Sequence, residues 1–136
     1  MVRFKNRYVI VDMTSMRKLP NVQPRDIYAL VVGAIGNNFG DVGAGLMQQS
    51  TQVVYYNAAT HIVVVRCGRE YATCIQACLT FITELHNQDI KFETLRVCGS
   101  NRTCKDALLA ISLQRIDNAT ARDAITREID ALEQKD

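Results

Sequence analysis

The order of its hydrophobic patterns constrains the fold of this chain more than any other feature. Residues 7–13 (RYVIVDM) are rich in β-branched and aromatic side chains, which is typical of a short strand. After a connector with two prolines, apolar side chains recur every three or four residues, the period of an amphipathic helix. This predicted helix begins at Pro24 and ends at Gly36-Asn37-Asn38. Its apolar positions are Ile27, Leu30, Val31, Ala34 and Ile35.

Further patterns of both kinds follow in the middle of the chain. Residues 46–56 (LMQQSTQVVYY) and 61–67 (HIVVVRC) predict two strands, joined as an antiparallel hairpin by a short polar turn. Residues 69–86 keep the 3.6-residue period of a helix. Residues 90–98 (IKFETLRVC) alternate apolar and polar side chains, as in a strand with one solvated face.

The resulting order, β-α-β-β-α-β, is that of ferredoxin-like and RNA-recognition-like domains. The prediction is therefore an α/β protein of the α+β type, with a four-stranded antiparallel sheet and both helices on one face. Helical patterns at 101–116 and 120–134 either cover the open sheet face or serve a partner. The 136 residues predict a single domain, 1–136, with a core at about 1–99 and C-terminal helices at about 101–134.

A glycine-rich segment, GNNFGDVGAG (36–45), separates the first helix from the hairpin. It lacks the Gly-Lys-Ser/Thr ending of a nucleotide-binding P-loop. It also follows a helix, whereas a Rossmann fingerprint follows a strand. We therefore expect a long, flexible connection here.

The five cysteines point to buried thiols rather than to disulfides or zinc. Their number is odd, and we find no secretory signal that would direct them to an oxidising compartment. Cys74 and Cys78 lie four residues apart on a predicted helix, but no CxxC pair or nearby histidine completes a zinc site. No apolar stretch approaches the roughly 20 residues that a membrane-spanning helix needs. We expect no metal site and no membrane association.

No arrangement of residues predicts a catalytic site. The two histidines, His61 and His86, lie at element edges and in no recognisable catalytic motif. The carboxylates of the last helix alternate with arginines, as on a solvated helix face. We therefore expect no catalytic residue and no cofactor bound by the protein.

Positive charge is concentrated at the start of the chain. Residues 1–25 hold six cations and one anion, whereas the remaining residues hold ten cations and thirteen anions. Arg3, Lys5 and Arg7 alternate along an extended segment, so they line one side of it, with Phe4 and Tyr8 on the other. This asymmetry favours a local surface for a polyanion, although a solubilising arm would share it.

The pattern favours contact with nucleic acid through phosphates rather than through stacked bases. The strand at 61–67 has no aromatic residue, whereas RNA-recognition motifs stack bases on aromatics of the sheet. Tyr55 and Tyr56 are the nearby candidates, and one of them should point into the core. The cations and the start of the helix at 101 are suited to bind phosphate. The predicted RNA-binding residues are Arg3, Lys5, Arg7, Arg66, Arg69, Arg102 and Lys105.

Three segments resemble the Pop-five family, the small protein subunit of archaeal and eukaryotic ribonuclease P and of ribonuclease MRP. They are MVRFKNRYVIVD (1–12), VVYYNAATHIVVVRCGREY (53–71) and LRVCGSNRTCK (95–105). The third departs from the family pattern because Ser100-Asn101 replaces the usual Thr-Ile. The resemblance covers residues 1 to about 115.

This resemblance implies a non-catalytic subunit of a ribonucleoprotein. In ribonuclease P the RNA holds the Mg²⁺ ions and removes the 5′ leader of precursor tRNA. The implied partners are the ribonuclease P or MRP RNA, precursor tRNA through the complex, and other protein subunits, including a TIM-barrel one. The implied location is the nucleus or nucleolus in a eukaryote and the cytoplasm in an archaeon.

Two other functions remain open at this point. One is a stand-alone RNA- or DNA-binding module. The other is a regulatory domain that binds a metabolite through the 36–45 segment. The apolar stripe of the last helix, Ile125, Ile129 and Leu132, is a candidate partner surface.

Overall fold

The computed structural model describes residues 5–15, 22–85 and 87–132 of the chain. Its strands are β1 (Asn6–Ser15), β2 (Gln52–Asn57), β3 (Ile62–Gly68), β4 (Glu84–Leu85) and β5 (Gln88–Cys98). Its α-helices are α1 (Pro24–Met47), α2 (Ala72–Phe81), α3 (Asn101–Arg115) and α4 (Ala119–Asp130). Two single turns of 3-10 helix, η1 (Gln48–Ser50) and η2 (Arg69–Tyr71), precede β2 and α2.

The strands form one antiparallel sheet in the order β2-β3-β1-β5-β4, with β1 at its centre. Without β4, this is the strand order of the predicted ferredoxin-like fold, so the predicted α+β class is confirmed. The fifth strand was missed because residues 84–85 were predicted to continue a helix over 69–86. The helix ends at Phe81, because Ile82 has extended backbone angles (φ −77°, ψ 123°). Leu85 and Glu84 then pair with the start of β5.

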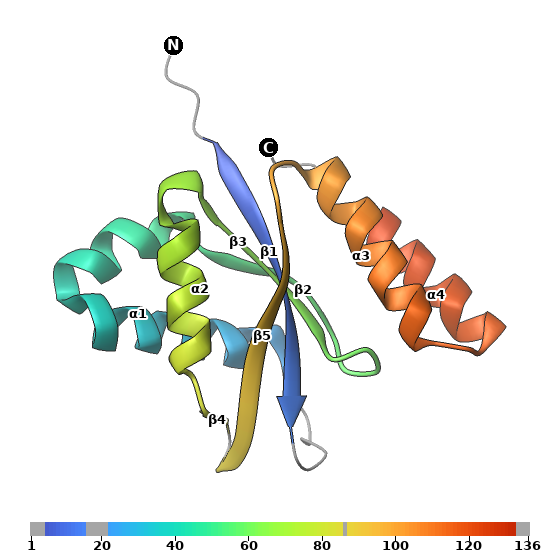
Figure 1. Cartoon of the computed structure of the whole chain (residues 1–136), viewed down its shortest axis with the longest axis horizontal. Coiled ribbons are helices and arrows are strands. Elements are labelled where there is room, and N and C mark those ends of the chain that lie inside the picture. Colours follow the sequence, from blue (N-terminus) through green and yellow to red (C-terminus); the bar gives the residue numbers. More distant parts are fainter. Residues whose placement is uncertain (1–4, 16–21, 86, 133–136) are drawn as a thin grey trace.

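Helices cover both faces of the sheet, which makes the molecule a three-layer sandwich (Figure 1). Along β1, Val9, Val11 and Met13 pack in one core with α1 and α2. Tyr8 and Ile10, which point to the other face, pack in a second core with α3 and α4. The sequence left open whether the C-terminal helices cover the sheet or serve a partner, and in the structure they cover it.

The stripe on α4 is therefore part of the protein's own core. Ile125 and Ile129 are buried against the sheet, and Leu132 is packed beside them. Its interpretation as a candidate partner surface was wrong, because the same apolar spacing serves equally well to dock a helix on a neighbouring sheet. α3 and α4 are also held together at their connection, where Arg122 Nη1 donates to the carbonyl oxygens of Leu113 and Ile116 at 2.7 and 2.9 Å.

The glycine-rich segment 36–45 is helical and not the expected flexible connection. α1 continues to Met47 and is interrupted only by a kink at Gly40 (φ 71°, ψ −173°). Beyond the kink Met47 is buried in the core, with Ala44 packed beside it. The strand predicted at 46–56 accordingly begins only at Gln52. Burial of these two side chains outweighs the weak helix propensity of the glycines.

Candidate nucleic-acid interface

The topology brings those predicted RNA-binding residues that the structure describes to one end of the sheet. β1 begins there, β3 and β5 end there, and α3 begins there (Figure 1). In the register, Asn6 lies opposite Gly68, and Tyr8 lies opposite Cys98. The N–H of Arg69 donates to the carbonyl oxygen of Lys5 at 2.9 Å, which joins the start of β1 to the turn after β3. We call this the basic end; of the residues described, it comprises Lys5, Arg7, Arg66, Arg69, Arg102 and Lys105.

The leading strand presents its cations on the face that carries α1 and α2. Lys5 is exposed and Arg7 is half-buried, two residues before buried Val9 on the same side of β1. Arg7 Nη1 donates to the carbonyl oxygen of Asn6 at 3.0 Å. The guanidinium also lies near Gly99, where an added Cβ would be 3.7 Å from Arg7 Nη1. Arg3 lies outside the described residues.

Arg66 lies on the opposite face, next to the helices α3 and α4. It pairs across the sheet with Tyr8 and with Gln52. Its Nη2 donates to Gln52 Oε1 at 2.8 Å, whereas its buried Nε has no hydrogen-bond partner among the described residues. Arg69, in contrast, is exposed in the 3-10 turn that follows β3. Arg66 and Arg69, which are close in the sequence, therefore lie in different surroundings.

The start of α3 is capped by its own residues. Ser100 Oγ accepts from the N–H of Thr103 at 3.2 Å, and Asn101 is buried in the first turn. Arg102 is exposed, so its charge is available at the surface. Lys105 Nζ donates to the carbonyl oxygen of Asp130 at 3.1 Å, which ties α3 to the end of α4. Part of the hydrogen-bonding capacity of Lys105 is therefore used within the protein.

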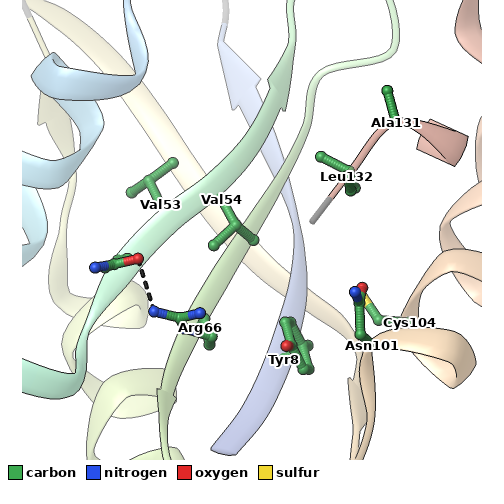
Figure 2. Close-up of a pocket in the computed structure, with 9 residues that line it drawn as sticks. Tyr8, Val53, Val54, Arg66, Asn101, Cys104, Ala131 and Leu132 are labelled. Atoms are coloured by element: carbon green, nitrogen blue, oxygen red, sulfur yellow. Dashed lines mark hydrogen bonds between the residues drawn. The ribbon is translucent and has the colours of Figure 1, made fainter. Parts of the chain in front are cut away.

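A pocket of about 250 Å³ opens at the basic end, between the sheet and the two C-terminal helices (Figure 2). Its polar side chains are Arg66, Gln52, Asn101 and the hydroxyl of Tyr8. Its apolar walls come from Val53, Val54, Cys104, Ala131 and Leu132. Sequence reasoning missed this pocket because its walls come from β1, β2, β3, α3 and the end of α4.

Arg96 is a further surface cation that the sequence analysis did not single out. It is exposed on β5, two residues before the end of the strand at the basic end. Burial raises the pKa of the neighbouring Cys98 thiol, and the positive charge of Arg96 partly offsets this rise. Strict alternation along 90–98 would place Arg96 on the side of buried Ile90 and Phe92, but the register shift opposite Ile10 and Val11 changes the side on which it lies. Its proximity to the other cations also depends on the sheet register.

The sheet offers no aromatic surface for base stacking at the strand pair β2–β3. Tyr55 is buried against α3 and α4, as expected for one of the two tyrosines, and Tyr56 is half-buried against the other core. Burial raises the pKa of both hydroxyls. α3 and α4 occupy the sheet face on which an RNA-recognition motif would stack bases.

The cysteines and other potential metal ligands of the described residues do not gather into a metal site. Within 5–15, 22–85 and 87–132, no three side chains of His, Cys, Asp or Glu cluster to hold a metal ion. All five cysteines are free thiols, and burial raises the pKa of Cys67 to about 11 and that of Cys104 to about 12. His61 lies exposed in the turn before β3, and His86 lies outside the described residues. Among the described helices, none has the length and apolar character to cross a membrane.

Fold and site together define a class: a small α+β protein with a helix-enclosed sheet and cations gathered at one sheet end. Residues 7–109 match the model of the Rpp14/Pop5 family, and the chain belongs to this family. It is 34% identical over 142 residues to ribonuclease P/MRP protein subunit POP5 of Homo sapiens, covering 95% of this chain and 87% of the human protein. The resemblance inferred from the three sequence segments is thereby confirmed.

Similarity also extends to an archaeal protein and to a solved structure. The chain is 27% identical over 99 residues to ribonuclease P protein component 2 of Methanosphaerula palustris, covering 73% of this chain and 58% of that protein. A chain in the cryo-EM structure of yeast ribonuclease MRP superposes with a TM-score of 0.56 at 9% identity, covering 75% of this chain and 79% of that chain. At this identity the structural match supports the fold alone.

Proposed function

We propose that this protein is a protein subunit of a ribonuclease P or MRP ribonucleoprotein and binds its RNA through the basic end. The observation that carries the proposal is the convergence of Lys5, Arg69 and Arg102 from three separate segments onto one end of the sheet. Family membership supports the same assignment, because its relatives carry the name of ribonuclease P/MRP subunits. The metabolite-binding alternative loses its support, since its loop at 36–45 is a helix.

The physical role of the basic end is to offset repulsion between phosphates. A folded RNA brings its phosphates close together, and fixed protein cations reduce the energetic cost of doing so. Each phosphate that a cation neutralises also releases counterions, so affinity depends on salt. Contacts of this kind position the RNA but read little of its sequence.

In this proposal the RNA performs the cleavage, and the protein supplies no catalytic group. The Mg²⁺ ions are held by the RNA, and the protein cations lower the Mg²⁺ concentration that the folded RNA requires. Precursor tRNA reaches the complex through the RNA, and other protein subunits, including a TIM-barrel one, contact this chain. The complex resides in the nucleus or nucleolus of a eukaryote, or in the cytoplasm of an archaeon.

The test compares two double variants with the same change in charge. Arg69→Ala/Arg102→Ala removes two exposed cations of the basic end, whereas Arg25→Ala/Lys91→Ala removes two exposed cations elsewhere. Lys91 lies opposite Thr14, toward the other end of β1. Binding of the ribonuclease P RNA is measured across a salt series.

For the basic-end variant, the slope of log K against log[salt] should become shallower by about 1.4–1.8, the sum of two phosphate contacts. The control variant should keep the wild-type slope. Equal slopes for both variants would remove the basic end from the RNA interface. Cleavage of precursor tRNA by the purified protein without RNA would contradict the non-catalytic role.

A further inference from the structure

We propose that the pocket beside Arg66 binds a single unstacked base of the RNA. This inference rests on the proposed RNA-binding function. It adds a site for a base to the phosphate contacts that the exposed cations make. The pocket lies at the basic end, so a strand whose phosphates contact Arg102 passes next to its opening. Proteins that recognise RNA commonly hold splayed-out bases against apolar side chains or guanidinium planes.

The walls of the pocket are suited to the faces of a base. Val54 comes from β2, and Leu132, which follows α4, lies on the other side of the pocket (Figure 2). Both are half-buried, so their side chains retain surface that a planar ring would cover. The volume of about 250 Å³ is below the usual range for larger ligands, and it favours a group the size of one base.

Arg66 provides the polar recognition. Its guanidinium is held in place because Nη2 donates to Gln52 Oε1 at 2.8 Å. A guanidinium has five N–H donors, and the bond to Gln52 uses one of them, so donors remain for a bound group although Nε itself is buried. A guanidinium has donors only, so the bound group has to present an acceptor. Guanine, uracil and cytosine offer carbonyl oxygens as acceptors, whereas adenine offers only ring nitrogens.

The surroundings of Arg66 distinguish this site from a simple phosphate site. A phosphate binds well at exposed cations such as Arg69 or Arg102, where its remaining oxygens stay hydrated. In the pocket the half-buried Arg66 shares the lining with Val54 and Leu132 as well as with Gln52, so a phosphate would lose part of its hydration there. A neutral ring with a carbonyl edge has no comparable cost.

The experiment follows methyl NMR signals of Val54 and Leu132 in the wild-type protein during titrations. Uridine is the probe for a base, adenosine tests the preference for a carbonyl acceptor over a ring nitrogen, and ribose 5-phosphate carries sugar and phosphate without a base. We expect uridine to shift these signals with a Kd in the millimolar range. Adenosine should shift them less, and ribose 5-phosphate should leave them unchanged.

Two single variants separate the pocket from the charged surface. Arg66→Lys keeps the charge but loses the planar fork, so the uridine shifts should disappear while the salt slope of RNA binding stays. Arg102→Ala should give the opposite result, with a shallower slope and unchanged uridine shifts. Backbone spectra of both variants confirm that they are folded.

Several results would overturn the assignment. Shifts caused equally by ribose 5-phosphate would make the pocket a phosphate site. Absence of any shift with uridine, with RNA binding and its salt slope intact, would refute the base pocket and leave the proposed function standing. If the wild-type protein did not bind RNA at all, both the base pocket and the proposed function would be refuted.

Discussion

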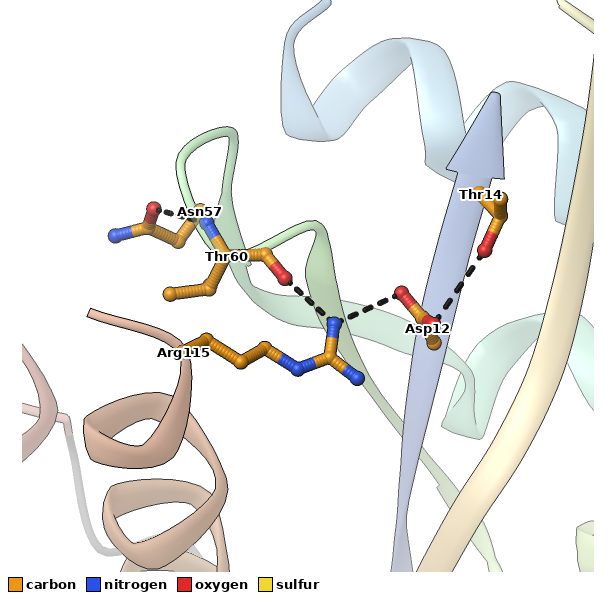
Figure 3. A network of polar contacts seen from close by, with 5 residues as sticks. All are labelled: Asp12, Thr14, Asn57, Thr60 and Arg115. Atoms are coloured by element: carbon orange, nitrogen blue, oxygen red, sulfur yellow. Dashed lines mark hydrogen bonds and ion pairs between the residues drawn. The ribbon is translucent and has the colours of Figure 1, made fainter. Parts of the chain in front are cut away.

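Arg115 Nη1 lies 3.1 Å from Asp12 Oδ1, and this ion pair joins the end of α3 to the central strand of the sheet (Figure 3). The same nitrogen donates to the carbonyl oxygen of Thr60 at 2.9 Å, in the turn between β2 and β3. That turn is ordered by Asn57, whose Oδ1 accepts from the N–H groups of Ala59 and Thr60 at 2.9 and 3.2 Å. One side chain of α3 therefore contacts two segments of the sheet.

Replacing Arg115 with alanine should lower the free energy of unfolding by about 1–2 kcal/mol. The variant loses two hydrogen bonds of a charged donor, and the partial exposure of both partners limits the effect. Urea unfolding measures the change, and the exposed Lys91→Ala serves as the control, with a change within about 0.5 kcal/mol. Equal stability of the two variants would indicate that the apolar core alone holds α3.

Replacing Ile129 with alanine tests whether the α4 stripe is core. Ile129 has no exposed surface, so the truncation should cost about 2–4 kcal/mol in the free energy of unfolding of the isolated protein. The exposed Thr120→Ala on the same helix is the control. A variant of wild-type stability that has lost a protein partner would restore the stripe as an interaction surface.

The kink in α1 should depend on Gly40. Its backbone angles (φ 71°, ψ −173°) lie in a region that almost only glycine adopts, although an added Cβ would meet nothing within 4 Å. Gly40→Ala should therefore destabilise the protein by about 1–3 kcal/mol through backbone strain alone.

The matched control for the kink is Gly33→Ala, in the regular part of α1. An added Cβ at Gly33 also has open space, and its backbone is helical. This substitution should stabilise the protein by about 0.5–1 kcal/mol. Thermal unfolding of both variants measures the difference. Stability changes of the same sign in the two variants would argue against a kink that depends on Gly40.

Stability should fall at high pH because of buried Cys67. Burial raises the pKa of its thiol to about 11 from an ordinary value of 9.0, an effect that the charge of Arg7 partly offsets. Between these values the unfolded chain loses the proton while the folded chain keeps it. The free energy of unfolding should therefore decline by about 1.4 kcal/mol per pH unit from this group.

The comparison for this pH dependence is between Cys67→Ala and Cys74→Ala, measured by urea unfolding from pH 8 to pH 11. Cys67→Ala should make the decline shallower by about 1.4 kcal/mol per pH unit, while buried Cys104, whose pKa is raised to about 12, continues to contribute. Cys74 is half-exposed, and its replacement leaves Cys67 in place. If the free energy of unfolding declined equally steeply in both variants, the decline would come from titrating groups other than Cys67.

The errors in the fold prediction have identifiable physical causes. Ile82 and Leu85 continue the apolar period of α2, so the sequence pattern extends the helix past its actual end at Phe81. The chain instead turns at Asn87, which has a positive φ of 61°, and pairs Leu85 with Gln88. Similarly, Met47 continues α1 through a glycine-rich segment because tertiary burial overrides local propensity.

The enclosed sheet left a signal in the sequence that was not used. Ile62, Val63, Val64 and Val65 are four consecutive apolar residues, and all are completely buried. Such a run indicates a strand covered on both faces, whereas alternation indicates one solvated face. The run could have favoured a third layer, although it does not identify the helices that form it.

By itself the sequence determined the order of strands and helices apart from β4, the absence of recognisable catalytic motifs and the family, because these are carried by local patterns. Tertiary structure decided which cations meet: Arg69 reaches Lys5 through a backbone hydrogen bond, and Arg66 turns to the opposite face toward Tyr8. It also created the pocket, whose walls lie up to about 120 residues apart in the chain. Antiparallel pairing and helix docking set these neighbours, and they depend on register and on packing between distant segments, which local side-chain patterns do not specify.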